Sequence, residues 1–241
     1  MKFLRAGIAA LTAAVLMMTA AACGEQKKEN DSIKQIDRPE TVATGDEVKT
    51  DVKPDAVEPS ENVNGKRLNV TLKSFTDAYN KELKRLGKTD QIVYEKWNKQ
   101  GKATKDDNDV PIQYWYYDDE EVNFTASVEI DSNKLVNIGC GTTMSRFMAE
   151  TEDEKNSDII LGKAALMAEC ACGFQSGSES VLQDIFFRTT TGSNDTLWYK
   201  GYVFNLSTKE NSSDSKKSVM LFRVFPITDE LKKEWKLTEY K

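Results

Sequence analysis

The chain has 241 residues, with 33 basic and 39 acidic side chains and a net charge of −6 at pH 7. It contains no histidine, which excludes Ser-His-Asp and Cys-His catalysis and every metal site that needs an imidazole ligand. The part of the sequence expected to fold has no long run of Lys and Arg. We therefore expect no binding to nucleic acid, which requires clustered basic charge.

The N-terminus has the pattern of an export signal. Lys2 and Arg5 are the only charged residues before Cys23, and residues 6–18 are almost wholly apolar. That apolar stretch has the length of a signal-peptide core and is shorter than the roughly 20 residues of a membrane-spanning helix. Because small residues lead up to Cys23, we predict that residues 1–22 are a cleaved signal peptide.

The residues before Cys23 resemble the lipobox of bacterial lipoproteins, although Ala20 stands where such boxes usually carry Leu. The resemblance implies a thioether-linked diacylglycerol on Cys23, with acyl chains of the palmitate class, and two chains anchor a protein stably to a bilayer. The domain would then lie outside the cytoplasm, on the cell membrane or the outer membrane. The alternative is an ordinary signal cut after Ala20 or Ala22.

Residues 23–64 are predicted to be the lipidated cysteine and a disordered tether. The stretch has three prolines, many charged residues and no aromatic residue, so it lacks the apolar surface that would offset the entropy of ordering. A flexible coil of this length has a root-mean-square span of roughly 35 Å. The tether would hold the folded part away from the membrane.

The first half of the folded part, residues 65–150, starts with a predicted helix over residues 71–86. Its apolar residues recur every three or four positions and Gly87 follows, a pattern typical of an amphipathic helix and its stop. We interpret residues 91–97 as a strand with Ile92 and Tyr94 facing inward, and residues 98–110 as a loop. The apolar stripe consists of Leu72, Phe75, Tyr79, Leu83 and Leu86.

Three strands are predicted next. Residues 112–117 are rich in aromatic side chains, and residues 121–130 alternate apolar and polar side chains, which indicates a strand with one packed face. A turn at residues 131–134 leads into a strand over residues 135–140, which would complete a hairpin.

The second half, residues 151–241, repeats this order. Residues 158–171 form a predicted buried helix that is interrupted only by Lys163 and Glu169. Strands are predicted over residues 181–190, 196–206 and 218–227, and a short C-terminal helix starts near Thr228. The sequence therefore predicts an α+β fold with helices packed on an antiparallel sheet. The repeated order suggests a tandem duplication of an α-β-β-β unit.

Three cysteines follow Cys23, and export would allow a disulfide between two of them. Cys170 and Cys172 are two positions apart and point to nearly opposite sides of a helix, so only one can reach Cys140. We favour a Cys140–Cys170 disulfide, with Cys140–Cys172 as the next choice. The alternative is three buried free thiols.

Two acidic stretches, residues 106–109 and 118–121, carry the carboxylates that calcium sites and glycoside hydrolases use. The first lacks the glycine of an EF-hand loop, and both lie in predicted turns. We interpret them as solvated turns, and we predict no catalytic residue, no metal site and no cofactor.

The aromatic run 114–117 suggests a recognition surface. If Tyr114 and Tyr116 face the core, Trp115 and Tyr117 lie on the open face of the sheet, beside Asn123 and Thr125. Aromatic rings among small polar residues suit a protein or glycan partner. The alternative is that this face is covered and Trp115 belongs to the core.

These features together predict a membrane-anchored cell-envelope lipoprotein whose domain is a non-enzymatic binding module. Its partner would be an envelope protein or a glycan. The alternative is a carboxylate-based hydrolase that acts on envelope polymers. A pair of carboxylates with shifted pKa values in one cleft would favour the hydrolase.

Overall fold

The computed structural model describes residues 58–62, 65–106, 108–119, 121–149, 156–191 and 195–241. The predictions for the signal peptide, for Cys23 and for most of the tether lie outside the described residues. Within them, no helix is long and apolar enough to cross a membrane.

An eight-stranded sheet forms the centre of the fold, in the order β10-β7-β8-β9-β6-β5-β4-β3. All neighbouring strands are antiparallel except β10 and β7. A separate hairpin consists of β1 (Ser60–Asn62) and β2 (Gly65–Arg67). The strands of the main sheet are β3 (Asn98–Lys105), β4 (Pro111–Asp118), β5 (Asn123–Glu129), β6 (Leu135–Thr143), β7 (Thr196–Tyr199), β8 (Tyr202–Lys209), β9 (Val219–Pro226) and β10 (Thr238–Glu239).

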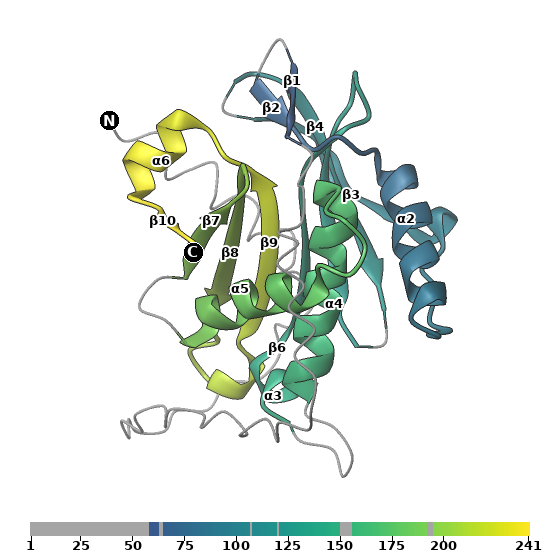
Figure 1. Ribbon diagram of the computed structural model, residues 1–241, viewed down its shortest axis with the longest axis vertical. Helices are drawn as coiled ribbons and strands as arrows, with labels where there is room; N and C mark the ends of the chain where they lie inside the picture. The colour runs from purple at the N-terminus through teal and green to yellow at the C-terminus, as the bar shows by residue number, and fades with distance from the viewer. Residues whose placement is uncertain (1–57, 63–64, 107, 120, 150–155, 192–194) are drawn as a thin grey trace, which may run out of the picture.

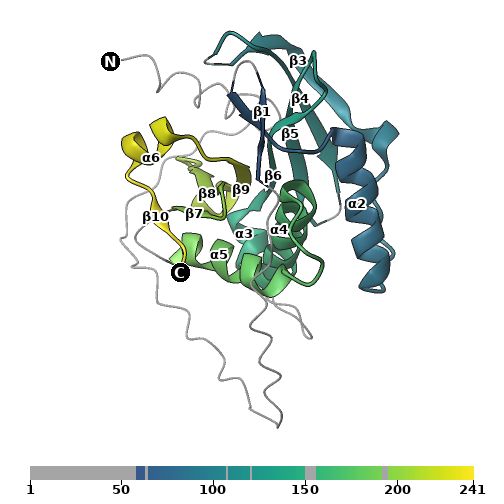
Figure 2. The same ribbon diagram turned by 45° about the horizontal axis from the view of Figure 1, so that its top comes forward.

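The three long helices lie on one face of this sheet, with α4 between α2 and α5 (Figures 1 and 2). The predicted α+β fold, with helices packed on a mainly antiparallel sheet, is confirmed. The helices are α2 (Leu72–Arg85), α3 (Met144–Phe147), α4 (Asn156–Cys172), α5 (Glu179–Thr191) and α6 (Asp229–Trp235), and short 3-10 turns occur at Tyr94–Lys96 and Ser215–Lys217.

Helix α2 forms as its sequence pattern predicts. Thr71 and Ser74 form a capping box in which the Thr71 hydroxyl accepts a hydrogen bond from the Ser74 amide. The apolar stripe faces the core from Leu72 to Leu83, whereas Leu86 at the end of the stripe is 44% exposed. The capping box therefore fixes where the helix begins, and the stripe fixes the face that it packs against the sheet.

The two halves of the chain meet where β6 pairs with β9. Strands β4, β5 and β6 are consecutive in the sheet, as are β7, β8 and β9, and Cys140 lies opposite Phe222 at the junction. The first half contributes the four-stranded meander β3-β4-β5-β6, and the second half contributes the meander β7-β8-β9 with β10 beside β7. This order departs from the predicted α-β-β-β repeat, because α2 precedes four strands in the first half and two helices, α4 and α5, precede the strands of the second. The tandem duplication stays a prediction.

The structure corrects several predicted elements. Residues 91–97, interpreted as a strand, contain the 3-10 turn Tyr94–Lys96 and no strand. Residues 98–110, expected to be a loop, contain the edge strand β3, which pairs with β4. Residues 181–190, expected to be a strand, belong to α5. The buried residues of α5 are Leu182, Ile185, Phe186 and Thr189, a helical spacing that the β-branched and aromatic content of the segment obscured.

The predicted strand over residues 196–206 is a hairpin of two strands. Lys200 and Gly201 form its two-residue turn, both with positive φ, as the tight turns of hairpins require. The division gives a meander of three strands, β7, β8 and β9, although the segment predicted as the first strand of this half forms α5. The short strand β10 adds a fourth strand from the second half.

Helix α4 forms the middle of the helical layer and is almost wholly buried. Its charged residue Lys163 is 9% exposed. The Lys163 ammonium lies 2.6 Å from an Asp119 oxygen, 2.8 Å from Glu121 and 2.9 Å from Asp90. These three carboxylates raise the pKa of Lys163 despite its burial, so the lysine is charged. Its ion pairs with Asp119 and Glu121 link the β4–β5 turn to α4.

We predict that Lys163→Met lowers the free energy of unfolding by about 3 kcal/mol, because removal of a buried cation leaves its carboxylates without a counter-charge. Urea denaturation measures the effect. Lys105→Met is the matched control: Lys105 pairs with Asp109, but both side chains are exposed, at 64% and 88%. That pair should contribute less than about 1 kcal/mol. Equal losses in the two variants would contradict the prediction.

Candidate functional site

The structure separates the four residues of the predicted recognition surface. Tyr117 lies opposite Phe124 and Trp115 opposite Ala126, on the face that packs against the helices. Tyr117 is only 5% exposed, and its ring lies 5.5 Å from that of Trp97. The placement of Tyr117 on the open face was therefore wrong.

Trp115 is also on the helix-bearing side. It is partly buried and packs against the core, and the Lys99 ammonium lies 5.3 Å from its ring centroid. The alternative, that Trp115 belongs to the core, describes its position better. Alternation alone does not tell which face of β4 packs against the helices, and Ile112, on the face opposite to Trp115, is also buried. At that end of the sheet, β2 supplies Arg67 to the buried carboxylate of Glu129, the residue opposite Ile112.

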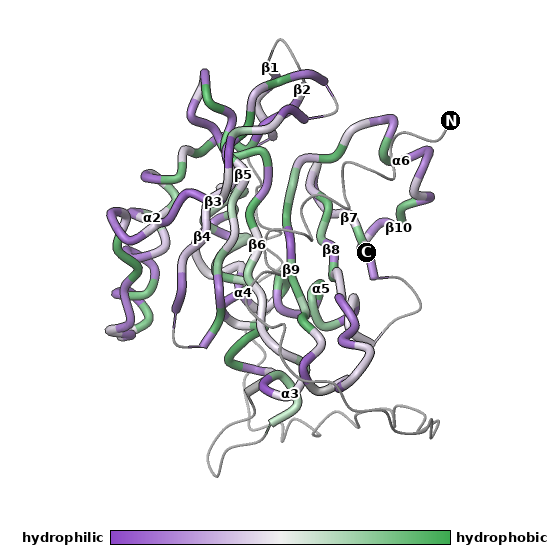
Figure 3. Tube along the Cα trace, turned by 180° about the vertical axis from the view of Figure 1, so that it is seen from behind, coloured by the Kyte–Doolittle hydropathy of each residue, from purple (hydrophilic) through white to green (hydrophobic). Residues whose placement is uncertain are grey.

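Asn123 and Thr125 do lie on the face that the long helices leave uncovered, which Figure 3 shows from behind. Their aromatic neighbours there are Tyr114 and Tyr116. The strand register aligns small and polar residues across this face, which we call the open face. One row runs through Asn98, Tyr116, Thr125, Gly139, Arg223, Asn205 and Thr196.

Arg223 lies across Gly139 in the middle of the row. A Cβ at Gly139 would come within 2.9 Å of Arg223 Cγ and 2.8 Å of the Phe222 carbonyl, so only glycine fits. The Arg223 guanidinium donates to Asn205 Oδ1 at 2.7 Å and to Ser207 Oγ at 2.5 Å. Burial lowers the pKa of Arg223 from its usual value. This part of the open face is therefore a fixed polar network.

A pocket of about 470 Å³ opens at one end of the open face. The β4–β5 turn contributes its carboxylates, and the end of β6 with the start of α3 contributes hydroxyl groups and a guanidinium. Because Asp119 and Glu121 also bind Lys163, α4 holds one wall of the pocket in place. The lining residues are Asp118, Asp119, Glu121, Val122, Asn123, Gly141, Thr142, Thr143 and Arg146.

The cysteines Cys140, Cys170 and Cys172 are all free and buried. The favoured Cys140–Cys170 disulfide is therefore absent, and the alternative of three packed thiols describes them. Cys140 lies near Lys163 and Asp119, whereas Cys170 lies near Glu169 and Glu179.

Burial raises the pKa of the Cys140 thiol to about 12 and raises those of Cys170 and Cys172 as well. A thiol with a raised pKa is neutral at pH 7 and a poor nucleophile. These three residues are therefore structural.

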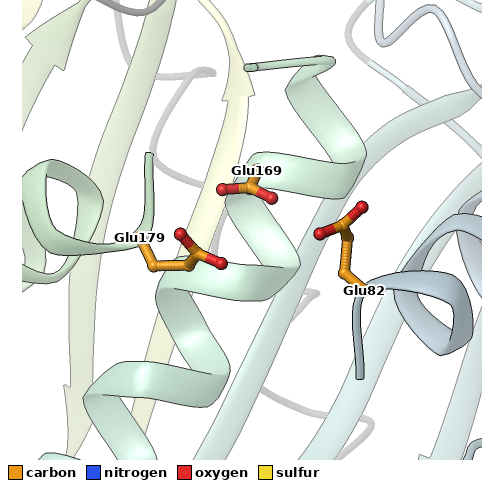
Figure 4. A group of neighbouring side chains, drawn as sticks. All are labelled: Glu82, Glu169 and Glu179. Atoms are coloured by element: carbon orange, nitrogen blue, oxygen red, sulfur yellow. The ribbon is translucent and has the colours of Figure 1, made fainter. Parts of the chain in front are cut away.

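Three glutamates converge where the three long helices meet. Glu82 comes from α2, Glu169 from α4 and Glu179 from the first turn of α5, and Figure 4 shows their carboxylates pointing toward one another. One oxygen from each lies within 4.8 Å of the others. We call this group the glutamate cluster.

The contacts of the cluster leave one oxygen unsatisfied. The Arg85 guanidinium donates to Glu82 and to Glu179, and the Ser176 hydroxyl donates to Glu82 at 2.7 Å. Glu169 is 2% exposed; its Oε2 accepts a bond from the Ser178 amide at 2.9 Å, while its Oε1 has no hydrogen-bond partner among the described residues.

This environment separates the pKa values of the cluster. Burial and the charge of Glu179 raise the pKa of Glu169 to about 7. Burial acts in the same direction on Glu82, but hydrogen bonds from Arg85 and Ser176 outweigh it and hold the pKa of Glu82 below its usual value. Glu169 is thus the member whose negative charge is poorly compensated.

Sequence reasoning did not identify this cluster. Its one signal was Glu169 itself, an acidic residue in the apolar run 158–171. A buried carboxylate needs partners, but Glu82 and Glu179 are distant in the sequence. The interpretation of the two acidic stretches as solvated turns holds for Asp109, whose side chain is 88% exposed, but it is wrong for Asp106 and Asp119, whose side chains are 15% and 13% exposed. Asp106 accepts hydrogen bonds from the Asn108 and Val110 amides. Asp106 is also paired with Arg67 at 2.9 Å.

Comparison with known proteins yields no relative. No family model matches the chain, and no curated protein and no solved structure shows significant similarity to it. The function must therefore be inferred from the residues themselves.

We predict that Glu169 makes stability fall as pH rises. Its folded pKa of about 7 lies above the usual value of 4.5, so its charging is disfavoured in the folded state. The penalty is absent below pH 4.5 and complete above pH 7, where it reaches roughly 3 kcal/mol.

Glu169→Gln removes this titration while it keeps the side-chain shape. In buffer with EDTA, so that only protons compete for the cluster, the wild type should lose stability relative to the variant between pH 5 and pH 8. Denaturant midpoints at several pH values measure this difference. A difference that stays constant with pH would show that Glu169 titrates normally.

Proposed function

We propose that this chain is a bacterial lipoprotein, anchored through diacylglycerol on Cys23, whose α+β domain is a non-enzymatic binding module outside the cytoplasm. The proposal rests first on the residues before Cys23, where a short apolar core and small residues precede the cysteine. The polar stretch after Cys23 supports it, because a flexible tether of that composition lets an anchored domain reach partners near the membrane.

The pocket at the end of the open face is the best candidate for the binding site. It combines carboxylates, the Asn123 amide, the Thr142 and Thr143 hydroxyls and the Arg146 guanidinium. Such groups can both donate and accept hydrogen bonds, as recognition of a hydroxyl-rich ligand requires. The half-buried rings of Tyr114 and Tyr116 on the same face add flat apolar surface. These groups favour an envelope glycan as the ligand.

The hydrolase alternative has one observation in its favour, the divergent pKa values of Glu169 and Glu82. A polymer cannot reach Glu169, however, because the carboxylate is buried under three helices and its free oxygen has almost no exposed surface. A general acid must lie within hydrogen-bond distance of the atom that it protonates. The binding module therefore remains the better proposal.

The lipid anchor predicts the behaviour of Cys23→Ser. The wild-type chain, expressed in bacteria, should incorporate a palmitate analogue and sediment with membranes. Cys23→Ser should lose both properties, because the hydroxyl does not accept the diacylglycerol. Cys170→Ala is the control, since it removes a thiol of the domain and leaves Cys23 intact. Labelled, membrane-bound Cys23→Ser would overturn the proposed anchor.

The pocket predicts binding to isolated cell wall. Detergent-solubilised full-length chain should co-sediment with purified peptidoglycan, and the double variant Asn123→Ala with Arg146→Ala should retain less than about a tenth of that binding, since each lost hydrogen bond to a charged or polar group costs about 1–2 kcal/mol. Arg188→Ala, which removes an exposed arginine from α5, is the control and should bind as the wild type does.

Two outcomes would count against the glycan. No co-sedimentation of the wild type would reject peptidoglycan as the ligand. Equal co-sedimentation of the wild type and the pocket variant, with both folded, would show that the wall is bound elsewhere on the domain. Capture of a protein by chemical crosslinking in the first case would redirect the proposal to an envelope protein.

A further inference from the structure

We propose that the glutamate cluster is a binding site for a divalent cation of the calcium type. The site is distinct from the pocket on the open face, because it lies in the helical layer on the opposite side of the sheet (Figures 1 and 4). It does not depend on the proposed lipoprotein function. Its donors are Glu82, Glu169 and Glu179, one from each long helix.

The spacing of the donors fits such an ion. Calcium binds oxygen ligands at 2.3–2.6 Å, so two ligands on opposite sides of the ion lie about 5 Å apart. The three carboxylate oxygens are within 4.8 Å of one another and can therefore surround one ion without movement of the helices. The Ser176 hydroxyl already contacts Glu82 at 2.7 Å and is a further oxygen donor beside the site.

Glu169 gives the strongest reason to expect a ligand. Its side chain is 98% buried, yet its Oε1 has no hydrogen-bond donor among the described residues. Buried polar oxygens in folded proteins are nearly always satisfied, and Oε1 belongs to a carboxylate that faces two others. A cation between the three would supply the missing partner and compensate the negative charge.

The glutamate cluster has more negative charge than its basic neighbours compensate. Three ionised glutamates carry −3, and Arg85 is the one basic side chain paired with them among the described residues. Arg85 is 44% exposed, so it can leave for solvent at little cost. The Glu82 and Glu179 side chains are 13% and 23% exposed, which gives an ion a route in. We infer that Arg85 holds the carboxylates together when no cation is bound.

A cation at this point would join α2, α4 and α5. Glu82 lies in the last turn of α2, and Glu179 lies at the start of α5, after the loop that leaves α4. Binding would therefore stabilise the helical layer against unfolding, since a ligand that binds only the folded state raises its stability by mass action.

The test is thermal unfolding of the purified full-length chain in nonionic detergent at pH 8, with EDTA or with millimolar CaCl₂. Saturating Ca²⁺ should raise the unfolding midpoint by roughly 5 °C, and calorimetric titration should show about one ion bound per chain. Mg²⁺ at the same concentration should have a smaller effect, because it keeps its waters and demands octahedral geometry.

Three variants locate the site. Glu169→Gln should remove the Ca²⁺-dependent rise, while near-ultraviolet circular dichroism shows that it is folded. Glu234→Gln, an exposed glutamate of α6, should keep the full rise. Arg85→Gln should lower the Ca²⁺ concentration that gives half of the rise by roughly threefold or more, because the competing positive charge is gone.

The proposal is overturned if Ca²⁺ neither binds nor raises the midpoint of the wild type, or if folded Glu169→Gln keeps the rise. An equal response to Mg²⁺ would overturn the preference for calcium. If the wild type and Arg85→Gln both show no Ca²⁺ response, and Arg85→Gln is less stable than the wild type, the cluster is a salt bridge centred on Arg85. None of these outcomes depends on whether the domain binds cell wall.

Discussion

The fold depends on the burial of α4 between two other helices and the sheet. A helix that is apolar on every side is stable only if every side is covered, and here α2, α5 and the sheet cover it. The two charged residues that interrupt its apolar sequence must then find partners inside the protein. Lys163 forms ion pairs with carboxylates of the β4–β5 turn. The Glu169 carboxylate lies close to Glu82 and Glu179 of the flanking helices. The helix thereby positions both the pocket and the glutamate cluster.

Much of the fold could be predicted from local patterns. Helix α2 has a stripe with a clear period and a cap, and β5 alternates apolar and polar residues, so each was placed correctly. Segment 98–105 could not be recognised as a strand, because β3 is an exposed edge held by main-chain pairing with β4 rather than by buried side chains. The prediction of a strand over residues 181–190 was wrong for a different reason. The aromatic and β-branched residues of this segment favour strands, but packing against α4 and β8 makes it a helix.

The candidate sites were harder to predict than the elements. On β4, the face that each side chain occupies depends on register, and a buried residue such as Ile112 gives the wrong face if its burial has a local cause. Asn123 and Thr125 were placed on the correct face only because β5 alternates strictly. The glutamate cluster arises from helices far apart in the sequence, so no spacing rule could join Glu82 to Glu169 and Glu179. What the sequence did show was the unusual position of Glu169 itself.

The pairing of β6 with β9 has a consequence for how the protein is made. Strand β6 is complete when residue 143 has been synthesised, but its partner is among the last elements of the chain. Until β9 arrives, β6 is the open edge of a half-built sheet, with apolar residues such as Ile138 on one side and unpaired main-chain groups along its length. Such an edge can pair with another chain. The pairing of β9 with β6 therefore also covers this edge, and after it two newly made chains can no longer associate through β6.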